Sequence, residues 1–477
     1  MQAMKKIIFV SALLMISSIL SAQTTGGALV STGNTFSSTI STDYQCLGLN
    51  PANLGWKDDE HFVHFDIGEL GFSVYAEPLD RKLVNQLFTG SEQFGRKEKQ
   101  EAAQKFSNKD VIFNGGMDGL GLSFQDASFG GVGFHIREKV MWESTLSEAT
   151  ADLMFNGYYS PYFDSISVSI EGDTTGWATV PKLVSQILGN TRVTLMQTRE
   201  YNLSYGYRVL QTKNFSLYAG AGAKYIEGYN AFSIDFGSGD NVIAFSAINP
   251  ALGIHFGESP SRIDNERYQP VGKGWGFDAG LSALIINKFR VVASVTDIGK
   301  IKWDGNVYVI TDDFVRKAED NGADNYQFFD LSGNQAMDNL KWGGWEGVAE
   351  HTTQLPTNMR FGAAYIHKAK FETGMEFLLP LNDAPGSHDR MISALGFRGH
   401  PVKWFRGSLG FVMAEGDAFL VPVGLYFFPF NNENFTWEIG FAIRDITTYF
   451  RQDKPTISAG IGVLRFGFGS IPKKKVE

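Results

Sequence analysis

The sequence of 477 residues is notable first for what it has little of. Cys46 is the only cysteine, so no disulfide can form within the chain. No later segment has the roughly 20 apolar residues that a membrane-spanning helix requires. The longest uncharged apolar run, 418–430, is short and contains two prolines. The formal net charge of −9 lacks the basic excess of nucleic-acid-binding proteins, so no nucleic-acid partner is expected.

Motifs of known catalytic and metal sites are also missing. The sequence contains no His-Glu-x-x-His, no Gly-x-Ser-x-Gly and no phosphate-binding P-loop. His61 and His64 have a spacing that a metal could use, but we expect them to be a surface pair at the start of a strand. The sequence therefore predicts that the protein is not an enzyme, with no catalytic residues, no cofactor and no metal.

The chain does show apolar residues at every second position, in segments of about ten residues. This alternation runs from Tyr201 to Val209, from Trp275 to Ile285 and from Phe435 to Ile443. A period of two is typical of β-strands with one apolar and one polar face. In a soluble sandwich the apolar faces would form a core, whereas in a transmembrane barrel they would face lipid and the polar faces would line a wet lumen.

Strand number and loop lengths favour the barrel. Fourteen strands are expected, near 61–75, 118–126, 130–142, 196–210, 214–236, 274–286, 288–304, 357–367, 369–380, 390–399, 404–415, 418–430, 434–446 and 456–470. Short turns alternate with long loops, the longest near 76–117, 143–195, 237–273 and 305–356, and a short helix is expected at Arg96–Phe106. Barrels of the outer membrane have an even strand number, short periplasmic turns and long external loops. The predicted fold class is all-β: a transmembrane antiparallel β-barrel of about 14 strands, surrounded by outer-membrane lipid.

The N-terminus predicts export. Lys5 and Lys6 precede an apolar stretch from Ile7 to Leu20, which is too short to span a bilayer and resembles a cleaved secretory signal peptide. Two placements remain open for the polar residues before the first strand: they hang in the periplasm or fold into the lumen. The expected organisation is a signal peptide at 1–22, an N-terminal hatch-like or plug-like segment at 23–60, an outer-membrane barrel with long extracellular loops at 61–471 and a polar periplasmic tail at 472–477.

The alternation places several charged residues on the inner face of the predicted strands. They include Glu200, Arg208, Lys224, Asp278, Arg360 and Glu376. Hairpin register suggests that Arg208 faces Ser216, that Lys224 faces Glu200 and that Arg360 lies near Glu376. Opposite charges across a ladder stabilise it by about 0.2–1 kcal/mol. Two interpretations remain open for these charges: a salt-bridge network that makes the wall rigid, or a path for a polar solute.

The first strand changes phase near Gly68 and Glu69. Apolar residues occupy odd positions up to Ile67 and even positions from Leu70 onward. A bulge that keeps the apolar residues outward would explain this change, and glycine suits a bulge. Such a bulge is either an ordinary device of curvature or a gap in the barrel wall.

Two short motifs suggest a family. Asn50-Pro51-Ala52, after a lead rich in Gly, Ser and Thr and before fourteen predicted strands, resembles the FadL-like outer-membrane transporters. The segment 297–303 resembles a recurring motif in a Bacteroidota family of unknown function from that superfamily. The resemblance implies a lumenal hatch containing this Asn-Pro-Ala motif, and a channel that takes a hydrophobic small-molecule ligand through a gap in the wall.

The resemblance also leaves a second function open. PorV-type barrels of the type IX secretion machinery are similar and have a different role. The alternative is therefore a sealed structural barrel without transport activity, whose partner would be a secretion-machinery component.

Overall fold

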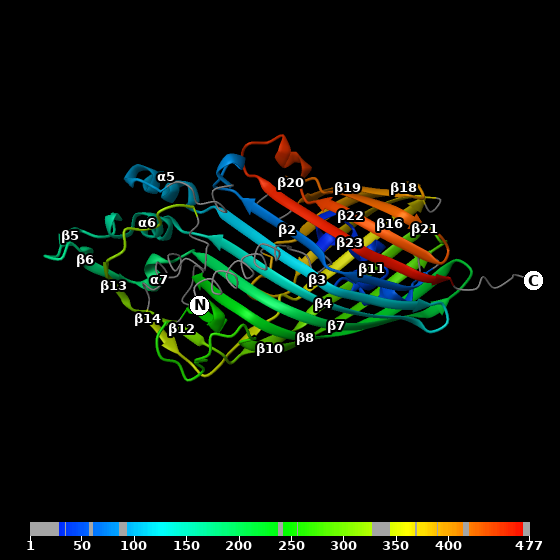
Figure 1. The fold of residues 1–477 in the computed structure, drawn as a ribbon, viewed down its shortest axis with the longest axis horizontal. Helices are drawn as coiled ribbons and strands as arrows, with labels where there is room; N and C mark the ends of the chain where they lie inside the picture. The colour runs from blue at the N-terminus through cyan, green and yellow to red at the C-terminus, as the bar shows by residue number, and fades with distance from the viewer. Residues whose placement is uncertain are drawn as a thin grey trace, which may run out of the picture.

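The computed structural model describes residues 28–470 apart from 34, 57–60, 85–92, 237–241, 255, 327–343, 368–369, 389 and 414–418. The expected signal peptide and polar tail lie outside the described residues. Long, tilted strands dominate the molecule, with a smaller mixed region at one end (Figure 1). Among the described residues, no helix is both long and apolar enough to cross a membrane.

The long strands close into one antiparallel barrel. In barrel order the strands are β1 (His61–Ile67) continued by β2 (Glu69–Ala76), β3 (Asp110–Asp126), β4 (Gly130–Thr145), β7 (Arg192–Gln211), β8 (Phe215–Phe236), β10 (Gly272–Ile285), β11 (Phe289–Trp303), β16 (Asn358–His367), β17 (Phe371–Pro380), β18 (Ile392–Val402), β19 (Phe405–Met413), β21 (Val423–Asn431), β22 (Phe435–Ile443) and β23 (Thr456–Ser470). Each pairs with the next, and β23 pairs back onto β1 and β2. With β1 and β2 counted as one interrupted strand, the predicted fourteen-stranded barrel is confirmed.

The two faces of the wall differ as the alternation predicts. On β10, the outward residues Trp275, Phe277 and Leu281 are 56%, 53% and 51% exposed, whereas the inward residues Asp278 and Ser282 are buried. A soluble sandwich would bury the apolar face instead. An extended belt of exposed apolar side chains on a closed barrel is the surface that lipid covers, so this is a transmembrane barrel.

The connections sort by length between the two ends of the barrel. The turns at 127–129, 212–214, 286–288 and 432–434 lie at one end, where His61 also pairs with Ser470. We call this the short-turn end. The first strand begins there and the last strand ends there. The long connections gather at the opposite end (Figure 1). The predicted asymmetry of loop lengths is confirmed.

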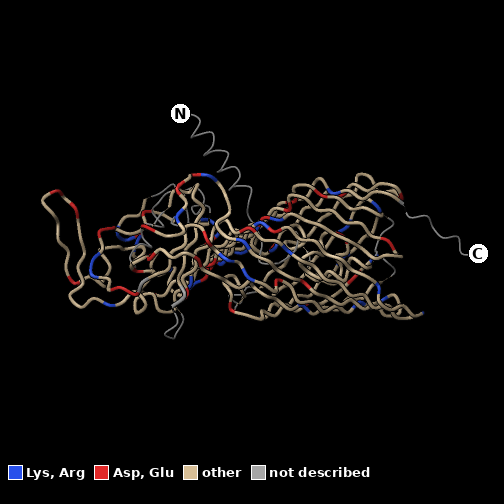
Figure 2. Tube along the Cα trace, turned by 90° about the horizontal axis from the view of Figure 1, so that it is seen from below, with Lys and Arg blue, Asp and Glu red and all other residues tan. Residues whose placement is uncertain are grey.

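The long connections build a folded cap. It contains α5 (Arg96–Phe106, as predicted), α6 (Glu148–Asn156), α7 (Val184–Ile187) and a separate sheet in the order β13 (Phe314–Ala318), β6 (Thr174–Leu183), β5 (Ser165–Val168). The barrel wall is extended into the cap by four short strands, β9 (Val242–Ile248), β12 (Val307–Thr311), β14 (Gly344–Gly347) and β15 (His351–Gln354). The two-residue strand β20 (Phe419–Leu420) pairs with β19. The cap is dense in acidic and basic residues, whereas most of the barrel trace is uncharged (Figure 2).

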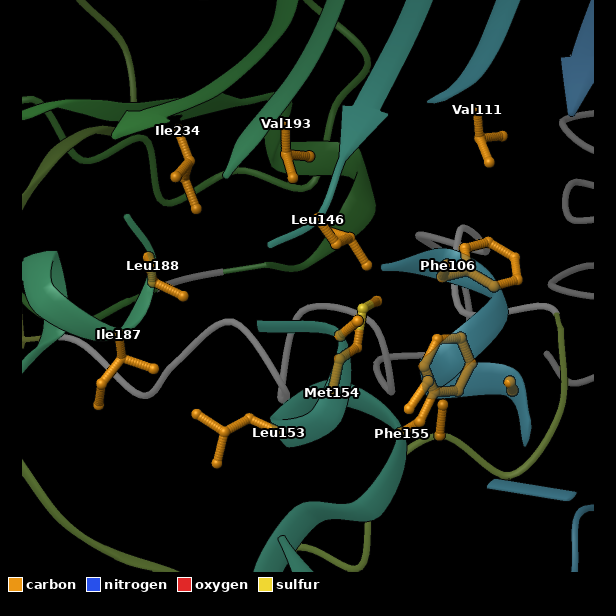
Figure 3. Close-up of a cluster of buried hydrophobic side chains, with 14 of the residues drawn as sticks. Phe106, Val111, Leu146, Leu153, Met154, Phe155, Ile187, Leu188, Val193 and Ile234 are labelled. Atoms are coloured by element: carbon orange, nitrogen blue, oxygen red, sulfur yellow. The ribbon is translucent and has the colours of Figure 1, made fainter. Parts of the chain in front are cut away.

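The cap has a hydrophobic core of its own. Phe106 of α5 and Phe155 of α6 are fully buried, with ring centroids 5.2 Å apart. Val193 and Ile234, which lie at the cap ends of β7 and β8, belong to the same cluster (Figure 3). The helices are therefore packed onto the extended strands, because apolar area buried against the wall stabilises them.

The N-terminal segment, residues 28–33 and 35–56, lies inside the barrel. Its elements are α2 (Ala28–Gly33), α3 (Ser37–Ile40) and the 3-10 turns η1 (Tyr44–Cys46) and η2 (Pro51–Gly55). α2 contacts β2 and β21–β23, α3 contacts β11, β16 and β17, and η2 contacts β4, β7, β8 and β10. Because these strands belong to different sides of the wall, the segment crosses the lumen. Of the two placements left open by the sequence, the structure shows the lumenal one.

Candidate functional site in the barrel lumen

The Asn50-Pro51-Ala52 motif forms a capped turn that is fastened to the wall. Asn50 Oδ1 accepts a hydrogen bond from Ala52 N (3.1 Å), and Pro51 occupies the first position of η2, where its missing N–H and fixed φ are favourable. Asn50 Nδ2 donates to Ser282 Oγ of β10 (3.0 Å), and Ser282 Oγ donates to Asn53 Oδ1 (2.5 Å). The motif thus determines both the conformation of the turn and its attachment to β10 of the barrel wall.

The second copy of the motif shows which part of this arrangement is local. Asn249 caps the turn η4 (Pro250–Leu252) in the cap, and its Oδ1 accepts from Ala251 N at 3.0 Å. The capped turn is therefore encoded by the three residues themselves. The attachment differs between the two copies: the Asn50 side chain donates to Ser282 of β10, whereas Asn249 N donates to Asn230 Oδ1 of β8 (2.9 Å) and its side chain donates to Gln269 O (2.7 Å).

Wall glycines make room for the N-terminal segment. A Cβ added at Gly220 or at Gly280 would lie closer than 3.0 Å to atoms of Asn50, Pro51 or Ala52. The same close approach to atoms of the segment occurs around the lumen at Gly121, Gly131, Gly133, Gly206, Gly362, Gly374, Gly396, Gly410, Gly440 and Gly460. Glycine is the residue that allows such close approach of backbones. The wall is thus shaped to the segment on all sides.

Two wall carboxylates hold backbone N–H groups of the segment. Glu376 accepts from Ser38 N (2.9 Å) and Ser38 Oγ (2.8 Å), and its other oxygen lies 2.9 Å from Arg360 Nη1. The Arg360–Glu376 contact is the one that hairpin register suggested. Glu69 Oε1 accepts from Leu29 N (2.5 Å) at the first turn of α2. These bonds satisfy N–H groups that a helix start leaves free.

Three of the other predicted lumenal charges, Glu200, Lys224 and Asp278, form ion pairs, with one correction. Lys224, fully buried, lies 3.0 Å from Asp278 and 2.5 Å from Asp297. Glu200 pairs instead with Lys139 of β4 at 2.7 Å. The expected pairing of Lys224 with Glu200 is therefore wrong. The carboxylates that pair with Lys224 come from β10 and β11, and alternation within one hairpin cannot reveal this.

Register explains the error. Arg208 lies opposite Tyr218 and not opposite Ser216, because the turn places Gln211 opposite Ser216. A bulge between Arg208 and Leu210 then shifts the β7–β8 ladder by one residue. Arg208 is half-buried near the short-turn end, where its Nη2 donates to Ala127 O at 3.3 Å. It lies at the mouth of the lumen, away from the buried ion pairs.

The first strand of the barrel is interrupted at Gly68. β1 ends at Ile67 and β2 begins at Glu69, and Gly68 has a φ of +76°. The register with β23 is unchanged across the break, since Ile67 pairs with Leu464 and Leu70 with Ile461. The rows between these two pairs are missing from the β23 ladder, and a Cβ at Gly68 would meet no atom within 4 Å.

The inward face changes phase at the same level on three adjacent strands. In β1 and β2 the buried residues switch from Asp66 to Glu69, and in β3 from Asp118 to Gly121. In β23 the adjacent residues Val463 and Leu464 are both exposed on the outside. The phase change predicted for the first strand is therefore shared by both neighbours, which keeps the pairing partners facing the same way.

A buried polar cluster lies behind the interruption. Asp66 and Glu69 have no exposed area, and Arg465 Nη1 pairs with Glu438 while its Nε lies 3.8 Å from Glu69. Arg465 Nε also donates to Tyr44 Oη of the N-terminal segment (2.9 Å). The cluster thus joins the interrupted wall to the segment.

Sequence reasoning missed part of this cluster. Asp118, Arg137 and Arg465 are all buried, and Arg137 forms an ion pair with Asp118. The signal was present, since Arg465 is a lone charge within the apolar run of the last strand. The phase change conceals it, because strict alternation places Arg465 on the outward face.

The expectation of a surface histidine pair is wrong. His61 and His64 are 5% and 9% exposed, and their ring centroids are 6.2 Å apart. His61 Nε2 lies 3.1 Å from Asn432 O, and Gly467 leaves room for the His61 ring. In the part of the chain that the structure describes, no three His, Cys, Asp or Glu side chains are grouped to hold a metal ion.

Comparison with known proteins gives a family. Residues 61–431 match the family described as a family of unknown function (DUF5723). The chain belongs to this family. No curated protein matches the sequence.

Solved structures with a similar backbone include a hydrocarbon channel and a toluene transporter. A mutant of the monoaromatic hydrocarbon channel TodX is 11% identical, with 93% of this chain and 99% of that chain covered and a TM-score of 0.47. The toluene transporter TodX of Pseudomonas putida (12%, 93% and 98%, 0.39) and a FadL homologue of Pseudomonas aeruginosa (10%, 94% and 99%, 0.41) are also similar. At this level of similarity, the fold assignment rests on the strand pairing of the DUF5723 chain itself.

Proposed function

We propose that this DUF5723 protein is an outer-membrane channel that takes up small hydrophobic compounds and releases them sideways through the wall at Gly68. The observation that carries the proposal is the interruption of the β1/β2 ladder with β23, beside a lumen that the N-terminal segment crosses. An apolar compound leaving there would pass into the lipid without crossing the periplasmic mouth.

The interruption is the place where the wall separates most easily. Every backbone N–H and C=O in a bilayer must be bonded, so parting two intact strands costs several kcal/mol for each group left free. At Gly68 the rows toward β23 are already absent, whereas Gly68 N still donates to Asp118 O of β3 at 3.0 Å. Separation of β2 from β23 at this level thus breaks fewer bonds than elsewhere. The rows at 67 and 68 are missing from the β3 ladder too, but there the bond from Gly68 N to Asp118 O holds the strand.

The N-terminal segment directs the path. It fits against glycines on all sides and is bonded to Ser282, Glu376 and Glu69, so a straight axial path would require the whole segment to leave. A sideways path at Gly68 requires only local movement of the first turn of α2, which Glu69 holds. The lateral path is therefore the less costly of the two.

The same contacts support a second candidate. A segment fitted this closely, together with buried ion pairs such as Lys224 with Asp278, also suits a sealed barrel that serves as a structural or secretion-associated component. In that case the partner would be a component of a secretion machinery of the PorV kind, and the interruption would only curve the wall.

Uptake separates the two candidates. Cells that carry the protein in the outer membrane are given radiolabelled toluene or a short-chain fatty acid at low concentration, with cells lacking the protein as the reference. Faster saturable uptake supports the channel. No difference in uptake for any apolar probe, together with co-purification of a secretion component from mildly solubilised membranes, supports the sealed barrel and overturns the channel.

A further inference from the structure

The outer wall carries a groove that the channel proposal does not use. It has a volume of about 600 Å³ and lies over β16–β19 near the short-turn end. Most of its lining residues point outward by strand parity, among them Phe371, Phe397 and Leu409, which are 52%, 46% and 43% exposed. The groove is therefore on the side of the wall that faces lipid.

Two paired glycines form the floor of the groove. Gly399 and Gly407 are direct partners in the β18–β19 ladder and lie on the outward face. A Cβ at Gly407 would first meet the Phe405 ring at 3.4 Å, which is an ordinary contact distance. A side chain would therefore fit at this position, and the space is open because residue 407 is a glycine. At Gly399 a Cβ would lie 3.1 Å from the Phe371 ring, so this ring already covers part of that glycine. The depression that remains is bordered by the apolar residues Phe371, Phe397 and Leu409.

The mouth of the groove is basic. Lys370 directly precedes Phe371, and Lys403 follows the end of β18; both are exposed. Lysines also occupy the neighbouring short turns, at Lys213 and Lys288. Lysine at the end of a membrane strand places its ammonium group in the headgroup layer, and Trp404 (61% exposed) is the type of residue found at that depth.

We propose that this groove is a binding site for an anionic phospholipid of the periplasmic leaflet. One acyl chain lies over Gly399 and Gly407 between the aromatic side chains, and the phosphate is held at Lys370 and Lys403. An apolar groove alone would accept any acyl chain. The two lysines at the short-turn end of the groove favour a net negative headgroup, since a zwitterionic headgroup carries a cation that the lysines repel.

The test uses the intact barrel in detergent. Phosphatidylglycerol and phosphatidylcholine with identical acyl chains are added separately, and bound lipid is counted by native mass spectrometry. We expect phosphatidylglycerol to be retained about tenfold better, a difference of 1.4 kcal/mol. Gly407→Leu fills the groove and should abolish this preference, and K370A with K403A should reduce phosphatidylglycerol to the level of phosphatidylcholine.

Controls separate a site from ordinary boundary lipid. Ala293→Leu adds three carbons, one fewer than Gly407→Leu, to the outward face of β11, outside the groove, and should leave retention unchanged. Glycerophosphoglycerol, the headgroup without acyl chains, should not bind, because binding depends on an acyl chain that lies in the apolar groove. Heat-modifiable gel migration verifies that each variant is a folded barrel. Equal retention of the two lipids by the wild type, or unchanged preference in Gly407→Leu, overturns the proposal.

Discussion

The close fit of the N-terminal segment predicts that one added methyl group will loosen it. In Gly220→Ala the new Cβ would lie closer than 3.0 Å to backbone atoms of Pro51 and Ala52. These atoms belong to a capped turn held by Asn50, so they cannot rotate away as a flexible side chain would. Overpacking of this kind costs about 1–3 kcal/mol, and a clash with fixed backbone belongs at the upper end.

The loss of docking free energy can be measured through the reactivity of the Cys46 thiol. The thiol is fully buried within the segment, and burial raises its pKa well above the ordinary value, so neither access nor the thiolate fraction favours reaction. If docking of the segment is weakened by about 3 kcal/mol, the undocked population rises roughly 100-fold, because each 1.4 kcal/mol is a factor of ten. The rate of maleimide labelling of Cys46 should rise by up to the same factor.

The assay is maleimide labelling of barrels in outer-membrane vesicles, followed by mass spectrometry. Ala221→Leu is the matched control, since Ala221 neighbours Gly220 on the same strand but faces outward, and its labelling rate should equal that of the wild type. Heat-modifiable migration confirms that the barrel remains closed in both variants. Labelling of Gly220→Ala at the wild-type rate would refute the inference that glycines set the fit of the segment.

Three further outcomes follow from the same structure. Leu281→Arg, on the lipid face, should reduce folded barrel through a cost of about 2–4 kcal/mol, whereas Leu281→Met should not; equal yields of both would contradict a lipid-facing position. Lys224→Ala leaves Asp278 buried without its cation and should destabilise the barrel by about 3–5 kcal/mol in urea titrations, and a change below 1 kcal/mol would mean that water reaches the site. An epitope tag at Gly172, in the cap, should be reached by antibody on intact cells and one at Lys213 should not; the reverse would invert the topology.

How much of this could be predicted from the sequence depends on the range of the interactions concerned. Alternation fixes which face of a strand is apolar, because successive side chains point to opposite sides, so strand positions, barrel class and loop asymmetry were predictable. Register was not, since it is set by the turn, which pairs Gln211 with Ser216, and by the bulge after Arg208, and neither is visible in the alternation. The partners of Lys224 were therefore out of reach.

The lumen illustrates the same limit. Strand alternation places Ser282 on the polar face, so it predicts that a charged residue would be tolerated at this position. The structure shows it buried and bonded to Asn50 and Asn53, more than 200 positions away, so an arginine there would displace the N-terminal segment. No local pattern marks that contact, although the Asn-Pro-Ala motif does mark its other half.

The central claim, release through the wall at Gly68, is tested most directly by locking that wall. In a Cys46→Ala background, Ile67→Cys with Leu464→Cys joins partner residues at the edge of the interruption, and Phe72→Cys with Ala459→Cys joins partners in the continuous ladder farther along. Toluene uptake by cells is then measured before and after reduction. Lateral release predicts that the 67–464 disulfide abolishes saturable uptake, that reductant restores it, and that the 72–459 disulfide leaves it near normal. Full uptake with the 67–464 disulfide formed would contradict the account.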